Sequence, residues 1–213
     1  MSNVQTTMLD PFPYKFENPN NAKVVPDDVF SGVNAIMVPD GFVIPGHRNG
    51  GVYIMVQDSQ DITKTTKTVK ITNNIDGTWY HTGNWVDMNG DGRKDLLIAR
   101  TNAKAQREGD GELLWLEHPA ADALDGSAWT EHVITTGPDV WTSIDTMAAY
   151  PGELIVWSAQ FFDETVSVHR VSLTDGSMIG SRVIDDNTIA MEGYKVMRGF
   201  KFHPVDLNGD GNK

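Results

Sequence analysis

The chain has 213 residues, of which 39% are hydrophobic and 22% are charged, and its formal net charge is −12. This length allows a full hydrophobic core in one domain or two small ones. The acidic balance argues against a nucleic-acid partner, because contact with a phosphate backbone needs a concentrated positive face. The absence of cysteine excludes disulfides and thiolate metal sites. No apolar run is long enough to predict a membrane span.

Residues 1–29 are assigned to an N-terminal segment, and short strand patterns begin after it. The first unit is expected near residues 30–73. It opens with GVNAIMVPDGFVIPGH (32–47), which reads as two apolar strands around an Asp-Gly turn, and continues with GVYIMVQ (51–57) and KTVKIT (67–72).

Two further units follow the same order. The second, near 80–135, contains GNWVDMNGDGRKDLLIAR (83–100), GELLWLE (111–117) and WTEHVI (129–134). The third, near 140–185, contains WTSIDTMAAYPGELIVWSA (141–159), TVSVHRV (165–171) and GSRVI (180–184). A truncated fourth, near 194–213, offers one strand pattern and most of a loop, DLNGDGNK.

A period of about sixty residues with four short strands in each unit is typical of the blades of a β-propeller. A β-sandwich is the alternative, but in-phase motifs favour the propeller. We therefore expect an all-β fold, a β-propeller of four-stranded antiparallel blades present as an incomplete ring of about three blades plus the start of a fourth. The remaining blades would come from a longer chain or from a second chain, because an open ring leaves sheet faces and a strand edge bare.

The loop DMNGDGRKD presents oxygen atoms at alternate positions, as hard cations require. Its candidate ligands are Asp87, Asn89, Asp91, the carbonyl of Arg93 and Asp95. Gly90 and Gly92 allow the chain to wrap an ion. Ca²⁺ is the expected metal and Mg²⁺ the alternative, while an ion-free Asp/Asn/Gly turn is the competing interpretation. An EF-hand is excluded because Ile98 stands where its final glutamate would be.

The segment VDMNGDGRKDLLIA resembles the repeat of FG-GAP/VCBS-type propellers, such as the heads of integrin α-subunits. The resemblance covers about residues 30–213 and is strongest at 83–135 and 198–213. It implies a structural Ca²⁺ in the hairpin between the first two strands of a blade, and an extracellular location, although no signal peptide is visible. The implied ligands are the five residues named above and a second, incomplete set: Asp206, Asn208, Asp210 and the carbonyl of Asn212.

The loops on the opposite face of such a ring are the expected place for a ligand. Their candidate residues are His47, Arg48, His81, Arg107, Trp141 and Phe161. Aromatic rings beside Arg and His suit a carbohydrate or protein partner. The alternative is that Trp79, Trp141 and Phe161 simply pack between blades.

The expected function is that of a calcium-stabilised, adhesion-like module that binds carbohydrate or protein. No nucleophile elbow, phosphate loop or paired-histidine motif is present. Two alternatives remain. One is the propeller portion of a sugar-active lyase, because WLEHP and FFDETVSVHR resemble the propeller of fungal aldos-2-ulose dehydratases; His47 or His81 would then accept a proton. The other is a purely structural scaffold.

Overall fold

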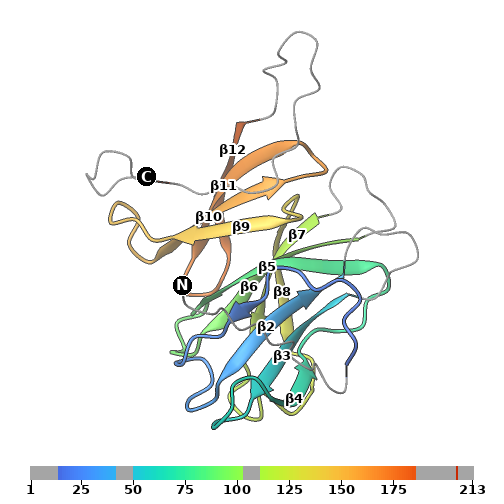
Figure 1. Cartoon of the computed structure of the whole chain (residues 1–213). Helices are drawn as coiled ribbons and strands as arrows, with labels where there is room; N and C mark the ends of the chain where they lie inside the picture. Colours follow the sequence, from blue (N-terminus) through green and yellow to red (C-terminus); the bar gives the residue numbers. More distant parts are fainter. Residues whose placement is uncertain (1–13, 42–49, 103–110, 186–204, 206–213) are drawn as a thin grey trace, which may run out of the picture.

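Three antiparallel sheets of four strands each make up the computed structural model, which describes residues 14–41, 50–102, 111–185 and 205. The first sheet contains β1 (Lys23–Val24), β2 (Ala35–Asp40), β3 (Gly51–Gln57) and β4 (Thr65–Lys70). The second contains β5 (Thr78–Val86), β6 (Asp95–Asn102), β7 (Gly111–Glu117) and β8 (Thr130–Thr136). The third contains β9 (Trp141–Asp145), β10 (Glu153–Gln160), β11 (Thr165–Ser172) and β12 (Met178–Asp185). The expected all-β fold and its four-stranded units are confirmed (Figure 1).

The strands of the second and third sheets lie where the sequence places them, but the first sheet starts earlier. β2 pairs with β1 on one side and with β3 on the other, so it is the second strand of its sheet. β1 lies before residue 30 and has only two residues, which is too short to produce a strand pattern. The strand expected after the Asp-Gly turn falls within 42–49, outside the described residues, as does the fourth unit apart from Val205.

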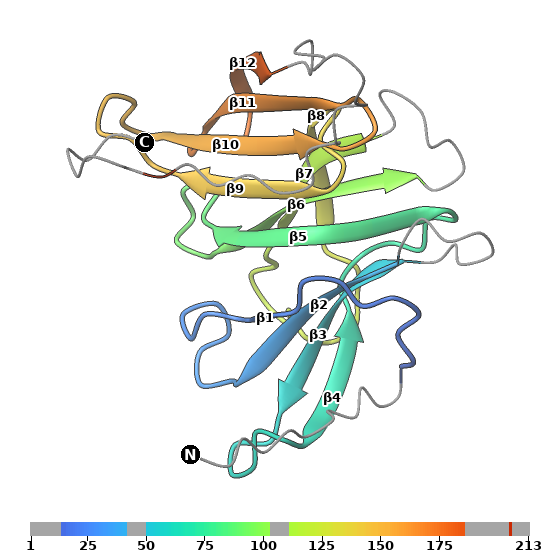
Figure 2. The ribbon, with the colours of Figure 1, turned by 45° about the horizontal axis from the view of Figure 1, so that its top comes forward.

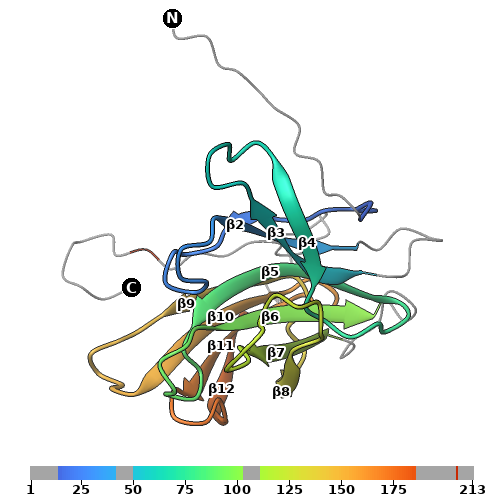
Figure 3. The ribbon, with the colours of Figure 1, turned by 90° about the horizontal axis from the view of Figure 1, so that it is seen from below.

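The three sheets pack face to face, with the second in the middle. Figures 2 and 3 show β5 between β2 and β9, and both strands contact it. A hydrogen bond joins β5 and β9, because Asn84 Nδ2 donates to the hydroxyl of Thr142 at 3.0 Å.

Both faces of β6 and β7, the inner strands of the second sheet, are buried. Leu96 and Ile98 of β6 pack against the first sheet in one core cluster, while Leu97 between them packs toward the third sheet in another. β7 divides in the same way, with Leu114 on the first side and Leu113 on the other. This explains the uninterrupted apolar runs LLIA and LLWL, because a strand buried on both faces has no polar side.

The segment before β2 is tied to the rest of the fold by side chains. Asn20 Nδ2 donates to the carbonyl of Tyr80 at 3.1 Å, and Lys23 Nζ donates to the carbonyl of Gly83 at 2.9 Å. On the other side, the buried carboxylate of Asp40 accepts the backbone N–H groups of Glu17 and Asn18, at 3.1 and 2.8 Å. Residues 17–24 therefore connect β2 of the first sheet with β5 of the second.

Candidate metal loop and loop face

The β5–β6 hairpin carries the candidate metal loop, residues 87–94, and Asp87 organises its first half. The Asp87 carboxylate accepts the N–H of Gly90 on Oδ1 at 2.8 Å and the N–H of Gly92 on Oδ2 at 2.9 Å. Gly90 and Gly92 have φ angles of 75° and 85°, which only glycine adopts without strain. The chain therefore curls around the Asp87 carboxylate.

Asn89 and Asp91 continue this inward turn. Asn89 Oδ1 accepts the N–H of Asp91 at 3.1 Å, and Asp91 Oδ1 accepts the N–H of Arg93 at 2.8 Å. The guanidinium of Arg93 forms an ion pair with the other oxygen of Asp91 and donates from Nε to the carbonyl of His118 at 3.2 Å. Side-chain oxygens of Asp87, Asn89 and Asp91 thus each accept a backbone N–H of their own loop.

Asp95 occupies a different environment, because it is fully buried at the start of β6. Its Oδ2 accepts the N–H of Met88 and its Oδ1 accepts the N–H of His118, both at 2.8 Å. Burial raises the pKa of the Asp95 carboxyl, and the two backbone N–H groups oppose that rise. Asp95 therefore fastens the metal loop to the end of β7.

The carboxylate and amide oxygens of this loop fit Ca²⁺ in type. Oδ2 of Asp87 and Oδ1 of Asn89 each accept one N–H and keep a lone pair, whereas Oδ1 of Asp87 accepts two N–H groups. Within the described residues, however, no group of three or more His, Cys, Asp or Glu side chains is placed to hold a metal ion. The cation nearest these oxygens is the guanidinium of Arg93 on Asp91. A bound ion would have to displace that guanidinium.

The corresponding loop of the third sheet, residues 146–152 between β9 and β10, is closed without carboxylates. Its turns are backbone hydrogen bonds, from the N–H of Tyr150 to the carbonyl of Met147 at 2.9 Å and from the N–H of Glu153 to the carbonyl of Tyr150 at 3.2 Å. Glu153 stands where Asp95 stands in the second sheet, and it forms a two-pronged ion pair with Arg170 at 2.6 and 2.7 Å. The Arg170 guanidinium lies 4.4 Å from the centre of the Tyr150 ring.

The candidate loop face is only partly described. His81 and Trp141 are 6% and 9% exposed, with ring centres 6.2 Å apart, and Phe161 packs against the cluster that contains Trp79 and Trp141. This is the inter-sheet packing that the alternative interpretation expects. Burial lowers the pKa of His81 to about 4, so its ring is neutral at pH 7 and turned away from solvent.

The other members of the predicted sites lie outside the described residues. These are His47, Arg48 and Arg107 on the loop face, and Asp206, Asn208, Asp210 and Asn212 of the second loop. None of the described geometry favours the sugar-lyase alternative.

Sequence reasoning missed two structural roles of buried polar groups. Asp139, which is 1% exposed, accepts the backbone N–H groups of Phe161 and Phe162 at 2.8 Å each, and burial raises its pKa to about 6. His169, on β11, is buried between the hydroxyls of Ser158 and Ser181 at 2.8 and 2.9 Å. The position of Asp139 directly after a Gly-Pro turn could have indicated its role. The alternating pattern around His169 gives no comparable signal.

Comparison with known proteins gives no match to a family model, a curated protein or a solved structure. Within the described part of the chain, no helix is long and apolar enough to cross a membrane.

Proposed function

We propose that the chain is a portion of an FG-GAP/VCBS-like β-propeller in which the β5–β6 loop binds Ca²⁺ and the assembled ring binds carbohydrate or protein. The observation that carries the proposal is the glycine-bearing loop between the first two strands of the second sheet, in which Asp87, Asn89 and Asp91 each turn a side-chain oxygen toward the backbone of their own loop. Three packed four-stranded antiparallel sheets, each formed by consecutive strands, support the propeller.

Calcium would act on stability in this arrangement. Two carboxylates in one short loop, with a third behind them, repel one another, and a divalent cation removes that repulsion. The ion would hold the loop against the end of β7 through Asp95 and His118. The strands beside it would then present their opposite loops on a rigid support.

Thermal unfolding with Ca²⁺ and with a chelator tests the metal site. At a free Ca²⁺ concentration about a hundredfold above Kd, the ion should stabilise the chain by about 2.7 kcal/mol. Asp87→Asn should abolish this response, because it removes a charge and an oxygen ligand. Asp145→Asn, at the corresponding position of the β9–β10 hairpin, is the matched control and should leave the response unchanged. A melting temperature that does not depend on Ca²⁺ would exclude the site, and equal stabilisation by Mg²⁺ would remove the preference for Ca²⁺.

A further inference from the structure

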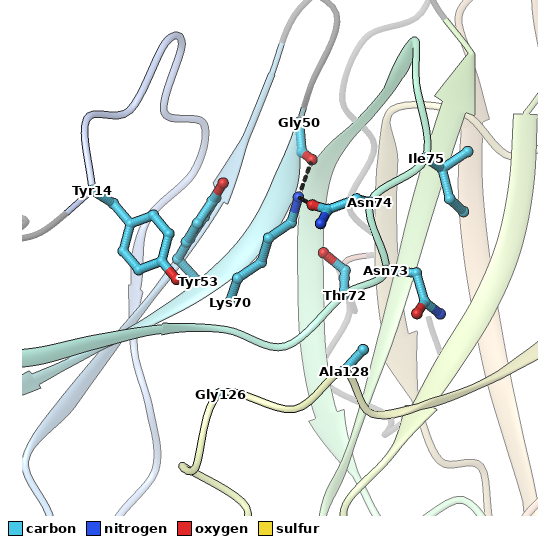
Figure 4. Close-up of a pocket in the computed structure, with 10 residues that line it drawn as sticks. All are labelled: Tyr14, Gly50, Tyr53, Lys70, Thr72, Asn73, Asn74, Ile75, Gly126 and Ala128. Carbon is cyan, nitrogen blue, oxygen red and sulfur yellow. Dashed lines mark hydrogen bonds between the residues drawn. The ribbon is translucent and has the colours of Figure 1, made fainter.

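A pocket of about 540 Å³ lies beside the end of β4, away from the metal loop (Figure 4). Its walls come from the N-terminal segment, from β3 and β4, from the 73–75 connection and from the β7–β8 connection near Gly126. The side chains that matter most are Tyr14, Tyr53, Lys70, Thr72 and Asn74. This volume is in the range of pockets that hold a small organic molecule.

Lys70 supplies the charge of this pocket. Its Nζ donates to the carbonyl of Gly50 at 3.1 Å and to Oδ1 of Asn74 at 2.8 Å, both neutral acceptors. Among the described residues no carboxylate forms an ion pair with Lys70. Asp40 favours the charged form from a distance, but its own oxygens are engaged by Glu17 and Asn18. Burial disfavours the ammonium and lowers the pKa of Lys70. A bound anion would compensate the charge and use the third N–H of Nζ.

Two tyrosines form the apolar side of the pocket. The rings of Tyr14 and Tyr53 are 5.0 Å apart, and the Lys70 ammonium lies 5.7 Å from the centre of the Tyr53 ring. Tyr53 is 8% exposed whereas Tyr14 is 38% exposed, so Tyr14 has ring surface available to a ligand. Exposed tyrosine surface with a polar tip suits a molecule that is apolar on one face and hydroxylated at its edge.

Amide and hydroxyl groups complete the lining. Asn74 keeps its Nδ2 donors while Oδ1 accepts from Lys70, whereas the Thr72 hydroxyl is buried, at 4% exposed, and accepts the N–H of Val52 at 3.1 Å. Among the described residues that line the pocket, Lys70 is the one with a cationic side chain. One ammonium among neutral donors matches a carboxylate with a single charge better than a phosphate, which carries more charge and usually meets several cationic or backbone donors.

We propose that this pocket binds a carboxylated sugar, with the carboxylate on Lys70, the sugar face against Tyr14 and a sugar hydroxyl on Asn74. The proposal deepens the carbohydrate-binding function proposed above by naming a ligand class and a site. It moves that site from the loop aromatics, where Trp141 and His81 are buried, to the edge of the first sheet, where Tyr14 and Lys70 are accessible.

Calorimetric titration of the unaltered protein with glucuronate and with glucuronamide tests the role of the carboxylate. The two sugars differ only in that group, so glucuronate should bind about tenfold more tightly, as expected for one charge-assisted hydrogen bond. Raising the ionic strength should reduce that difference. A galacturonate oligomer distinguishes a polysaccharide residue from a free sugar acid, and saturable binding of the oligomer or of the monomer supports the site. Equal binding of glucuronate and glucuronamide, or no saturable binding of any of these sugars, would overturn the proposal.

Variants then assign the binding to this pocket. Lys70→Met keeps the aliphatic stem and should weaken glucuronate binding about tenfold while glucuronamide binding is unchanged. Tyr14→Ala should weaken both sugars. Lys64→Met is the matched control, because Lys64 stands just before the start of β4, is 73% exposed and pairs with Asp61. Undiminished glucuronate binding in Lys70→Met would contradict the assignment.

The metal site and the sugar site can fail separately. Lys70→Met should keep the calcium response, and Asp87→Asn should keep glucuronate binding. Loss of both properties in either variant would contradict two independent sites.

Discussion

The β5–β6 and β9–β10 hairpins occupy the same place in neighbouring sheets, yet different chemistry closes their turns. In the first, the carboxylate of Asp87 gathers backbone N–H groups and the buried Asp95 holds the loop to β7. In the second, backbone hydrogen bonds form the turn, and Glu153 reaches outward to Arg170. The strands and the core therefore determine where the hairpin forms, while the loop between the strands can differ in sequence and in the way that it is closed.

Substitution at the two equivalent acids should give the largest contrast. Asp95→Ala leaves the N–H groups of Met88 and His118 unpaired in a buried place, and the free energy of unfolding should fall by on the order of 3 kcal/mol. Glu153→Ala should cost far less, because solvent screens its ion pair with Arg170. Urea unfolding of both variants measures the difference. An equal fall in the free energy of unfolding in both variants would mean that Asp95 and Glu153 contribute equally to stability.

Exchange of the loops tests whether the hairpin tolerates either turn. Replacing residues 87–94 by the sequence of 145–152 keeps the length and brings in a turn that closes through backbone hydrogen bonds. We expect a folded chain that has lost the calcium-dependent gain of about 2.7 kcal/mol at a hundredfold excess over Kd. Circular dichroism and thermal unfolding with Ca²⁺ provide the measurement. A graft that unfolds would show that the loop itself directs the hairpin.

A fall in pH should destabilise the third sheet through protonation of His169. Burial lowers its pKa from 6.5 to about 4, so the unfolded chain takes up the proton first as the pH falls through this window. The free energy of unfolding therefore keeps its full value above pH 6.5 and falls as the pH drops toward 4. By pH 5 it should have fallen by about 2 kcal/mol. His169→Gln should flatten the dependence of the melting temperature on pH between 7 and 5. An unchanged slope would exclude this role.

The smallest expected effect is that of replacing a glycine by alanine in the turn of either hairpin. Gly90 and Gly152 have φ angles of 75° and 78°, and an added Cβ would meet nothing closer than 3.6 Å at Gly90 and nothing within 4 Å at Gly152. Alanine at either position should therefore cost about 1 kcal/mol through backbone strain alone. Thermal unfolding in chelator keeps any ion out of the comparison. A clearly larger loss at Gly90 would point to a second role for that turn.

The sequence predicted most of the sheets because their apolar patterns are local. Runs such as LLIA and LLWL require burial on both sides, and the Asp/Asn/Gly loop indicates a hairpin between two strands. β1 could not be predicted, since its two residues are held by side chains such as Lys23, which reaches β5. The packing of Trp141 between sheets was one of two interpretations of the sequence, but the burial of His81 could not be predicted, because it depends on contact between strands that are far apart in the sequence. The lining of the Lys70 pocket comes from four separate segments, and no single motif marks it.

The burial of β6 and β7 on both faces has a consequence for assembly. A sheet with apolar side chains on both faces is not stable alone, because these faces stay exposed to water until a neighbouring sheet packs on each of them. The first and third sheets therefore both depend on packing against the second sheet. The three sheets should gain and lose structure as one cooperative unit, and the slowest exchange of amide hydrogens belongs to β6 and β7.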